Sequence, residues 1–301
     1  MNKFTKVFLM VIASLFVLGI ILFSFGINRH GAESAWRLLS RSSIVTHGIR
    51  IGGIDNEEDN GNVAKVHKGE ESDFLASEIE NIEIAIGATN AVFKLSEDDR
   101  IHVINESNQD INAYIMSDKL KIKSSDETDI LVPEGTLYIA IPYGLTLEKL
   151  DMDYGAAKIE CENDLGVKCD KVMLDIGAGD VTLAGINADG IEINLGAGNL
   201  ALKNVYCDNL GGQIGMGNMD YSGDITGDME IDCSMGNVTM LLDSSKGDHN
   251  LSYSVAAGNL SINNEELSGL GESKSGNADA DSSYNIELSM GNVELFFADK
   301  L

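Results

Sequence analysis

The sequence is short of aromatic residues, proline and positive charge. Phe, Trp and Tyr make up only 6% of the 301 residues, with a single Trp, and proline occurs twice. Lys and Arg number 21 against 48 Asp and Glu, which gives a formal net charge of -27. A chain this acidic would repel a phosphate backbone, so the composition excludes a nucleic-acid-binding protein. The 44% of apolar residues and the 32 glycines are typical of short strands joined by glycine turns around a core.

The charge is unevenly divided along the chain. Residues 1–50 hold six basic residues and one acidic residue, whereas residues 51–301 hold 15 basic and 47 acidic residues. Within the basic part, residues 7–27 are a run of 21 uncharged and mostly apolar residues behind Lys3 and Lys6. At about 1.5 Å per residue, a helix of this length crosses the roughly 30 Å hydrocarbon core of a bilayer. The run predicts a single transmembrane helix that acts as an uncleaved signal anchor, with a cleaved signal peptide as the alternative.

The orientation of this helix rests on a small difference between its flanks. Lys3 and Lys6 precede it, and Arg29, Arg37 and Arg41 follow it, so the flanking charges nearly balance. The short leading tail is typical of an export signal. We therefore expect the N-terminus on the cytoplasmic side of the cell membrane and the acidic body on the outer side.

Four parts of the chain are expected on this basis. They are a short N-terminal tail (1–6), the transmembrane helix (7–27), a juxtamembrane segment with an acidic linker (28–77) and a β-strand repeat domain (78–301). Around Trp36, apolar residues alternate with arginine, which favours either a short amphipathic segment at the bilayer surface or an ordinary linker helix. Residues 54–77 are acidic and lack periodicity, which predicts a flexible spacer.

The repeat domain is recognised by a short pattern beyond residue 150. Each copy is an apolar strand, a turn of small residues that ends in Asn or Asp, and a second apolar strand, as in Ile214-Gly215-Met216-Gly217-Asn218-Met219. A degenerate copy at 154–159 precedes the others. Three successive steps between copies are equal, and the equivalent turn positions are Lys158, Asp180, Asn199, Asn218, Asn237, Asn259 and Asn292, with steps of 22, 19, 19, 19, 22 and 33 residues.

Apolar residues alternate with polar residues on both sides of each turn. Met229, Ile231 and Cys233 fall on one face of an extended strand, and Asp228 and Glu230 fall on the other. A unit of two such strands cannot bury its own apolar face, so successive units must stack. The constant step favours an all-β fold, a β-solenoid with coils of roughly 19–22 residues, over an antiparallel sandwich in which each turn is a hairpin.

The turn residues have an expected role in this solenoid. Gly and Asn tolerate positive φ, and a corner that recurs in every coil is expected to need that geometry. Stacking would bring Asn199, Asn218 and Asn237 into register, where their side-chain amides can bond as a ladder. The last step of 33 residues implies an insertion, and the segment 272–283, rich in Ser, Asp, Ala and Gly, is expected to be that loop.

Between residues 78 and 149 the strand character persists but the repeat is blurred. Gly87-Ala88-Thr89-Asn90 echoes the later turns, and apolar alternation marks further strands. The first coils are therefore expected to be irregular, as terminal units of repeat arrays often are.

These segments carry a family resemblance. Leu137-Tyr138-Ile139-Ala140-Ile141-Pro142-Tyr143-Gly144-Leu145, followed by the Gly-Ala-Gly-Asp/Asn corners, resembles a bacterial family labelled "putative adhesin", which has β-strand repeats and is otherwise a domain of unknown function. The resemblance covers roughly residues 78–301. It implies an extracytoplasmic β-solenoid on a membrane anchor, no known catalytic residues and, for some members, an association with envelope-stress systems. The corner at Ala157-Lys158 and the long last step depart from the family pattern and leave the number of coils open.

The cysteines and histidines form no recognisable site. Cys161 and Cys233 occupy inward slots several coils apart and cannot pair, whereas Cys169 and Cys207 lie nearer the coil edges, where they could meet. No Cys-x-x-Cys or Cys/His cluster exists, so a zinc or redox site is not expected. The histidines are scattered and are expected to be exposed and solvated; they are His30, His47, His67, His102 and His249.

The many acidic residues are expected on the solvated outer face of the strands. Pairs such as Asp151 with Asp153 arise readily among 48 acids and do not indicate acid/base catalysis. Carboxylates stacked about 4.8 Å apart on neighbouring coils could attract Ca²⁺, but most corners carry neutral Asn and only Asp180 is acidic. We therefore assign no catalytic, cofactor-binding or metal-ligating residue and expect no cofactor.

The expected function is non-enzymatic. The chain is interpreted as a single-pass membrane protein whose extracytoplasmic β-repeat domain binds, adheres to or organises an uncharacterised cell-envelope ligand. A component of an envelope-stress sensing system is the alternative. A polysaccharide-active enzyme on a β-helix is disfavoured, because residues 151–301 contain seven Lys but no Arg and no Trp to line a substrate-binding face.

Overall fold

The computed structural model describes residues 64–124, 134–156, 158–266, 271–277 and 279–298. The predicted transmembrane helix, at residues 7–27, and most of the linker lie outside these ranges. Among the residues described, no helix has the length and apolar character needed to cross a membrane. Two single turns of 3-10 helix, η1 (Ala76–Glu78) and η2 (Lys246–Asp248), accompany 22 strands in this part of the chain.

The central coils are built from parallel strands. β11 pairs in parallel with β9 and β12, β12 with β13, and β13 with β14 and β15, with residues 19 apart in register at most positions. This pairing confirms the β-solenoid and rules out hairpins at the central corners. The strands are β9 (Thr146–Tyr154), β10 (Lys158–Cys161), β11 (Val167–Ile176), β12 (Asp180–Leu195), β13 (Asn199–Ile214), β14 (Asn218–Ile225), β15 (Met229–Cys233) and β16 (Asn237–Leu242).

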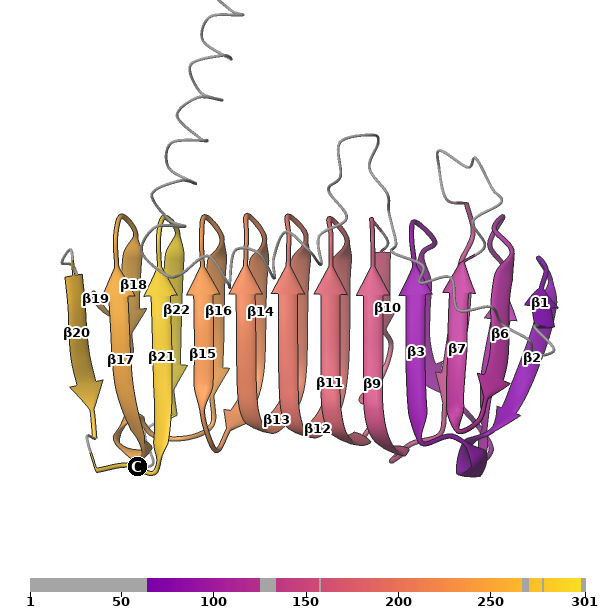
Figure 1. The fold of residues 1–301 in the computed structure, drawn as a ribbon, viewed down its shortest axis with the longest axis horizontal. Helices are drawn as coiled ribbons and strands as arrows, with labels where there is room; N and C mark the ends of the chain where they lie inside the picture. The colour runs from indigo at the N-terminus through magenta and orange to yellow at the C-terminus, as the bar shows by residue number, and fades with distance from the viewer. Residues whose placement is uncertain (1–63, 125–133, 157, 267–270, 278, 299–301) are drawn as a thin grey trace, which may run out of the picture. The chain divides into compact units, whose positions relative to one another are not determined.

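Each coil contributes to two opposed faces of the stack. The first face contains β9, β11, the later halves of β12 and β13, and β15, which lie side by side in Figure 1. The second face contains β10, the earlier halves of β12 and β13, β14 and β16. β12 and β13 pass from the second face to the first at Gly185 and Asn204, whose φ values of 72° and 51° allow the bend.

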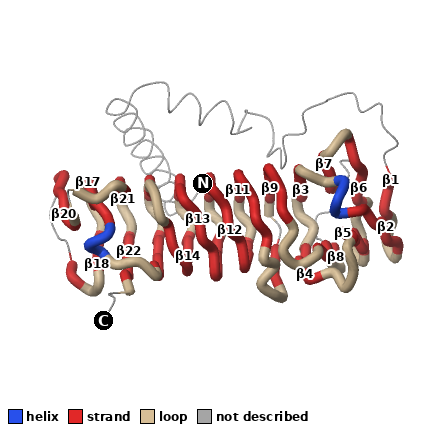
Figure 2. Tube along the Cα trace, turned by 90° about the horizontal axis from the view of Figure 1, so that it is seen from below, coloured by secondary structure: helices blue, strands red, loops and turns tan. Residues whose placement is uncertain are grey.

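At the C-terminal end the order of coils differs from the order of the chain. β21 (Ser282–Leu288) pairs with β15 on one side and β17 (His249–Val255) on the other, and β22 (Asn292–Phe297) lies between β16 and β18 (Asn259–Ile262). Figure 2 shows β17 and β21 on one side of the stack and β18 and β22 on the other. The coil formed last along the chain is therefore the penultimate one in space.

The segment expected to be an inserted loop is partly a strand. β20 (Gly271–Gly276) pairs antiparallel with β17 over six residues, and β19 (Glu265–Glu266) pairs antiparallel with β18. The loop prediction, made for 272–283, is therefore wrong for 272–276 and for Ser282 and Ser283, where β21 begins. Residues 272–276 cover the outer edge of the last coil, which would otherwise present unpaired backbone groups.

The N-terminal end is irregular, as expected. β3 (Asn81–Ile86) and β4 (Ala91–Leu95) stack in parallel on β9 and β10 on one side and on β7 (Lys119–Ser124) and β8 (Leu137–Ile141) on the other, and the strands beyond these pair antiparallel. Two of these outer strands, β1 (Ala64–Val66) and β2 (Glu70–Leu75), lie within residues 54–77, so the sheet begins earlier than the spacer prediction allowed. The remaining strands are β5 (Arg100–Asn105) and β6 (Ile111–Met116).

The core is a set of apolar columns that run along the inside of the stack. Met229, Ile231 and Cys233 are each at most 2% exposed, as the alternation predicts. One column ends each first-face strand and contains Tyr154, Ile176, Leu195, Ile214, Cys233, Leu288 and Val255. The apolar space enclosed by the N-terminal coils measures about 10 Å³, close to the least that holds one water molecule. The interior of these coils thus leaves no room for a ligand.

Candidate binding surface

One edge of the stack is formed by the Gly-x-Gly-Asn corners. The glycine that precedes the corner asparagine is required by close approach of the backbone, because a Cβ at Gly198, Gly217 or Gly236 would lie 2.0–2.3 Å from the carbonyl oxygen of the glycine one coil below. None of these three has a positive φ. The predicted reason for the glycines is therefore wrong, although the requirement for glycine is real. Coils can stack at strand spacing here only without side chains.

The asparagines of the corners form the predicted ladder on the second face. Asn218 donates a side-chain hydrogen bond to Asn199 at 2.7 Å and accepts one from Asn237 at 2.7 Å. Asn199 donates to Asp180, at the acidic end of the ladder. Beyond Asn237 the ladder continues to Asn292 at 2.8 Å and then to Asn259 at 3.0 Å, which follows the order of coils in space. The ladder confirms that the corners stack in register.

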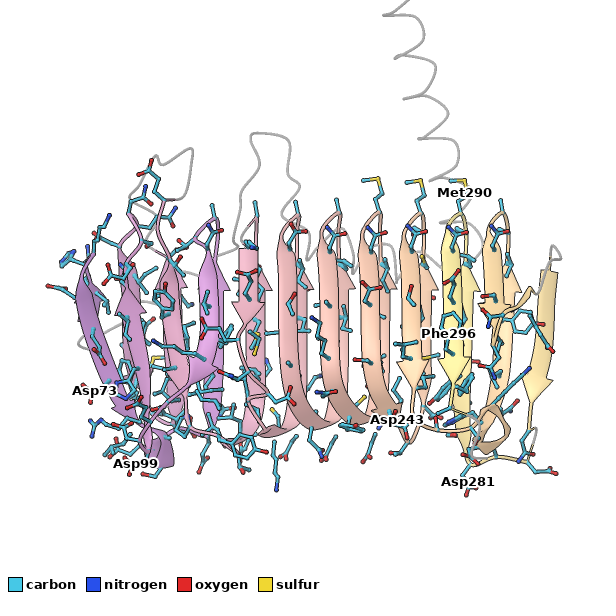
Figure 3. The ribbon with its side chains drawn as sticks, turned by 180° about the vertical axis from the view of Figure 1, so that it is seen from behind. Asp73, Asp99, Asp243, Asp281, Met290 and Phe296 are labelled. Atoms are coloured by element: carbon cyan, nitrogen blue, oxygen red, sulfur yellow. The ribbon has the colours of Figure 1, made fainter. Side chains whose placement is uncertain are left out.

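The residue before the Gly-Asn or Gly-Asp pair of each corner points into solvent. In three successive coils it is methionine, and Met216, Met235 and Met290 are 62%, 51% and 42% exposed. The backbone nitrogens of Met235 and Met290 donate to the carbonyls of Gly215 and Ser234, so the three corners are direct neighbours. We call these three residues the methionine ridge. Figure 3 shows Met290 at this edge of the stack.

The rest of the same edge carries alanine. Ala178 and Ala197 precede the methionine ridge in the stack and Ala257 follows it, and all three are exposed. Methionine side chains are flexible and polarisable, so they adapt to apolar partners of varied shape, whereas alanine offers only a methyl group. The large apolar tips are thus confined to three coils.

Acidic side chains flank the methionine ridge on both faces. Asp232 and Glu287 occupy adjacent outward positions on the first face, three residues before a ridge methionine. Asp220 and Glu294 lie on the second face, separated by Thr239. We call these four acids the acidic rim. Residues 211–298, which contain the ridge, include 14 Asp and Glu but only two Lys. The surface is therefore apolar at its crest and negative at its sides.

Several lysines lie further towards the N-terminal end of the stack. Lys119, Lys121 and Lys123 surround Glu83, with the shortest contact from Lys123 at 2.7 Å. Lys149 contacts Asp151 and Lys171 contacts Glu192, at 2.7 Å and 2.8 Å. Asp153 and Asp175 lie in register three residues before Ala156 and Ala178, so acidic side chains also flank the alanine corners.

The opposite edge of the stack is also acidic. Asp243 and Asp281 lie there in Figure 3, and Tyr206 donates a hydrogen bond to Asp243 at 3.0 Å. A depression of about 430 Å³ at this edge is lined by loop residues that include Asp248, Asp279 and Asp281. Within the ranges that the structure describes, no three His, Cys, Asp or Glu side chains converge as metal ligands would.

The cysteines point into the solenoid and are unpaired. Cys169 and Cys207 occupy the same inward column, but Ala188 of the intervening coil lies between them. Two coil steps amount to about 9.6 Å, beyond the Cα separation that a disulfide spans. The prediction that these two could meet is therefore wrong. Burial raises the pKa of all four thiols, that of Cys207 to about 11, which favours their protonated form.

The histidines were expected to be solvated, and His249 contradicts this. It is 2% exposed, its ring nitrogens lie 2.7 Å from the Ser282 hydroxyl and 2.9 Å from the Ser244 hydroxyl, and it stacks on Tyr284 at 4.1 Å. Burial lowers the pKa of His249, against the opposing influence of Asp224 and Asp248. The ring is a neutral hydrogen-bonding bridge inside the C-terminal coils.

His102 lies at the surface of the N-terminal end between two carboxylates. Its ring nitrogens contact Glu71 at 2.7 Å and Asp98 at 2.9 Å. Partial burial is the largest single influence and lowers the pKa of His102, but the hydrogen bonds to Asp98 and Glu71 together outweigh it and raise the pKa. His67 is exposed and contacts Asp110 at 3.0 Å, and the predictions for His30 and His47 fall outside the described residues.

The methionine ridge is the feature that sequence reasoning missed. Its signal was present, because the variable corner residue is Met in three copies of the repeat and Ala in the others. Its meaning requires the stacking order, which places the corner of Met290 directly beside that of Met235 although 55 residues separate them.

The chain matches one family model and is similar to several solved structures. The Toastrack DUF4097 family model matches residues 79–295. A solved structure described as a putative cell adhesion protein from Clostridium sporogenes is 12% identical, with 78% of this chain and 100% of that chain covered and a TM-score of 0.33. A putative adhesin from Bacteroides fragilis is 12% identical, with coverage of 75% and 95% and a TM-score of 0.41.

A third solved structure is described as a putative lipid binding protein from Parabacteroides distasonis. It is 14% identical, with 80% of this chain and 98% of that chain covered and a TM-score of 0.36. No curated protein matches the sequence. Because the family model covers more than two thirds of its length, the chain belongs to the Toastrack DUF4097 family.

Proposed function

We propose that this chain is a membrane-anchored protein whose β-solenoid lies outside the cell membrane and binds a component of the cell envelope. The observation that carries the proposal is an outer surface on which like residues stand in register on consecutive coils, as in the methionine ridge and the asparagine ladder. Neighbouring coils are about 4.8 Å apart, so an extended or repetitive ligand can contact several members of one row at once.

The packed interior supports a surface function. The apolar columns fill the inside of the stack, and the side chains that repeat without being needed for packing are the exposed ones at the corners. A stiff scaffold of this kind holds its surface groups at fixed spacing without paying an ordering cost on binding. The anchor and the outward orientation are supported by the 21-residue apolar run at 7–27 and its short basic leader.

Protease shaving tests the location. Cells stripped of their wall and expressing the full chain with a C-terminal epitope are digested before and after lysis, and the epitope is followed by immunoblot beside a cytoplasmic marker. Loss of the epitope from intact cells, with the marker preserved, is the expected result. Protection of the epitope until lysis would overturn the extracytoplasmic orientation and with it the envelope-binding function.

Deletion of residues 7–27 tests the anchor in the same cells. The full chain should remain with the membrane pellet after an alkaline carbonate wash, and the deletion variant should leave it. Retention of the deletion variant in the washed pellet would contradict anchoring by this segment. Because the deletion also removes the export signal, the deletion variant is compared with the full chain only by fractionation and not by protease shaving.

A further inference from the structure

The methionines of the ridge are grouped in space and not in sequence. Along the chain the corner residues follow the order Met216, Met235, Ala257 and Met290. In the stack, the backbone nitrogens of Met235 and Met290 each donate to a carbonyl of the preceding corner, at 2.8 Å and 2.7 Å, and Ala257 donates to Ser289 on the far side of Met290. The alanine thus lies beyond the end of the row, and the three thioethers form one uninterrupted group.

The sulfur atoms of the ridge are open to solvent and have only small residues beside them. Met216 lies between two glycines, and Met235 and Met290 each lie between a serine and a glycine. The three side chains are 62%, 51% and 42% exposed, and Figure 3 shows sulfur-containing side chains directed away from the strands at the edge where Met290 lies. A ligand can therefore reach the thioethers directly from solvent.

Three thioethers at this spacing can bind one metal ion together. Metal–sulfur bonds are about 2.3 Å long, so three sulfurs that surround one ion in a plane are about 4 Å apart. Neighbouring corners are about 4.8 Å apart and the outer two about 9.6 Å, so each outer sulfur must lean about 3 Å towards the centre. A methionine sulfur lies three bonds from its Cα and is moved by two side-chain torsions, which allows Met216 and Met290 to lean towards Met235 in this way.

The thioether group selects the kind of metal. Its sulfur is uncharged and polarisable, and such soft ligands favour Cu(I), whereas Ca²⁺ and Mg²⁺ prefer oxygen ligands and Zn²⁺ prefers thiolate and imidazole. We infer that the methionine ridge is a three-thioether binding site for one soft monovalent cation, Cu(I). The site is independent of the proposed envelope-binding function, because it needs only these three side chains.

Competition for Cu(I) tests the affinity of the site. The full chain in nanodiscs of zwitterionic lipid is titrated anaerobically, with ascorbate present, against a chromophoric Cu(I) chelator, and empty nanodiscs supply the background. The triple variant Met216→Leu, Met235→Leu, Met290→Leu keeps the apolar volume and removes the sulfurs. We expect its affinity for Cu(I) to be at least tenfold lower than that of the chain with the native ridge.

Two controls isolate the ridge from other soft ligands. Both proteins carry Cys161→Ser, because this half-buried thiol is itself a soft ligand, and the three buried cysteines are common to both. Met116→Leu should leave the affinity unchanged, since Met116 is 36% exposed but lies at the N-terminal end of the stack. Circular dichroism confirms that each variant is folded. Equal affinities with and without the ridge methionines, or an equal loss in Met116→Leu, would overturn the inference.

Protection from oxidation locates the bound ion. Ag(I) is the probe, because it has the charge and softness of Cu(I) and a thioether whose lone pair it occupies is shielded from peroxide. In chloride-free buffer, mass spectrometry should show that Ag(I) slows sulfoxide formation at least fivefold at Met216, Met235 and Met290 but not at Met116. Ca²⁺ at the same concentration should protect none of them. Equal protection by Ca²⁺, or equal slowing at Met116, would show a general effect of cations on this acidic protein and would overturn the inference.

Met235→Leu tests whether the three thioethers share one ion. Without the central sulfur, the remaining two stand on corners about 9.6 Å apart, so the protection by Ag(I) at Met216 and Met290 should be lost at both together. Undiminished protection at these two residues would show independent sites and would contradict a shared one. The proposed envelope location is tested separately by shaving, and none of these outcomes alters it.

Discussion

The side-chain amide of Asn292 donates a hydrogen bond to Asn237 at 2.8 Å, although 55 residues separate the two in the chain. Asn259, which lies between them in sequence, is the next member of the ladder beyond Asn292. The ladder therefore records the order of coils in space, and it shows that the coil containing β21 and β22 is inserted between two coils that were formed earlier along the chain.

The corner glycines should be intolerant of any side chain. Gly217→Ala places a Cβ 2.3 Å from the carbonyl oxygen of Gly198, and we expect a loss of about 2–3 kcal/mol, seen as a lower Tm in thermal denaturation. Gly211→Ala is the control, because a Cβ there meets nothing within 4 Å, and its effect should stay within about 0.5 kcal/mol.

Gly217→Asn distinguishes the two explanations for these glycines. Asparagine tolerates positive φ but carries a Cβ, so close approach predicts damage comparable to that of Gly217→Ala. A Tm near that of the native chain for Gly217→Asn would instead restore the positive-φ explanation.

The asparagine ladder should contribute to stability according to the number of bonds lost. Asn218 bonds to two neighbours, whereas Asn259 at the outer end bonds only to Asn292 within the ladder. We expect Asn218→Ala to cost about 1–2 kcal/mol and Asn259→Ala about half as much, measured by chemical denaturation. Equal costs for the two variants would show that the ladder does not act as a set of pairwise bonds.

The contributions of His249 and His102 to stability should change in opposite directions as the pH falls. His249 has a lowered pKa in the folded chain, so between pH 7 and pH 5 the unfolded state binds more protons and stability is lost as the pH falls. His102 has a raised pKa, so its pairing with Glu71 and Asp98 contributes stability at acidic pH that is lost as the pH rises through its folded pKa.

Thermal melts across this pH range test the assignment. His102→Gln removes the opposing contribution, so the Tm of that variant should fall more steeply between pH 7 and pH 5 than that of the native chain. His249→Gln should flatten the dependence, whatever its effect on the Tm at neutral pH. If neither substitution changed the slope of Tm against pH, the opposite pKa shifts assigned to His102 and His249 would be contradicted.

The thiols should be inaccessible until the solenoid unfolds. Cys169, Cys207 and Cys233 are 5%, 4% and 2% exposed, and burial raises the pKa of each. A thiol-reactive chromophore is expected to label none of these three within minutes under native conditions and all of them in denaturant, while half-buried Cys161 reacts first. Under mild oxidation the native chain should show no internal disulfide. A cross-link between Cys169 and Cys207 in peptide mapping would contradict the stacking of Ala188 between them.

The central coils could be predicted from the sequence because one physical constraint governs them. A 19-residue step places Asn199, Asn218 and Asn237 in line only if the coils are parallel and stacked, so periodicity determines the architecture. The reason for the corner glycines could not be predicted, because a positive φ and a close backbone approach both require glycine. The two causes therefore give the same sequence.

The ends of the stack could not be predicted because their partners are distant in sequence. A 33-residue step reads equally as a loop or as an inserted coil, and only the pairing of β21 with both β15 and β17 distinguishes them. His249 appears solvated beside Asp248 in the sequence, yet Ser282 and Tyr284 enclose it from a coil 33 or more residues away. The methionine ridge depends on the same rearrangement.

The inserted coil means that the last strands to be synthesised complete the inside of the stack and not its end. A nascent chain that has emerged as far as Ile262 already contains β17 and β18, but their parallel neighbours in the finished stack are β21 and β22, which emerge later. Removal of residues 282–298 would thus take out an internal member and leave β17 and β18 detached, whereas removal of a terminal unit merely shortens an ordinary repeat array. The C-terminal segment 282–298 therefore completes the stack, because the coil that it forms joins β17 and β18 to the rest of the solenoid.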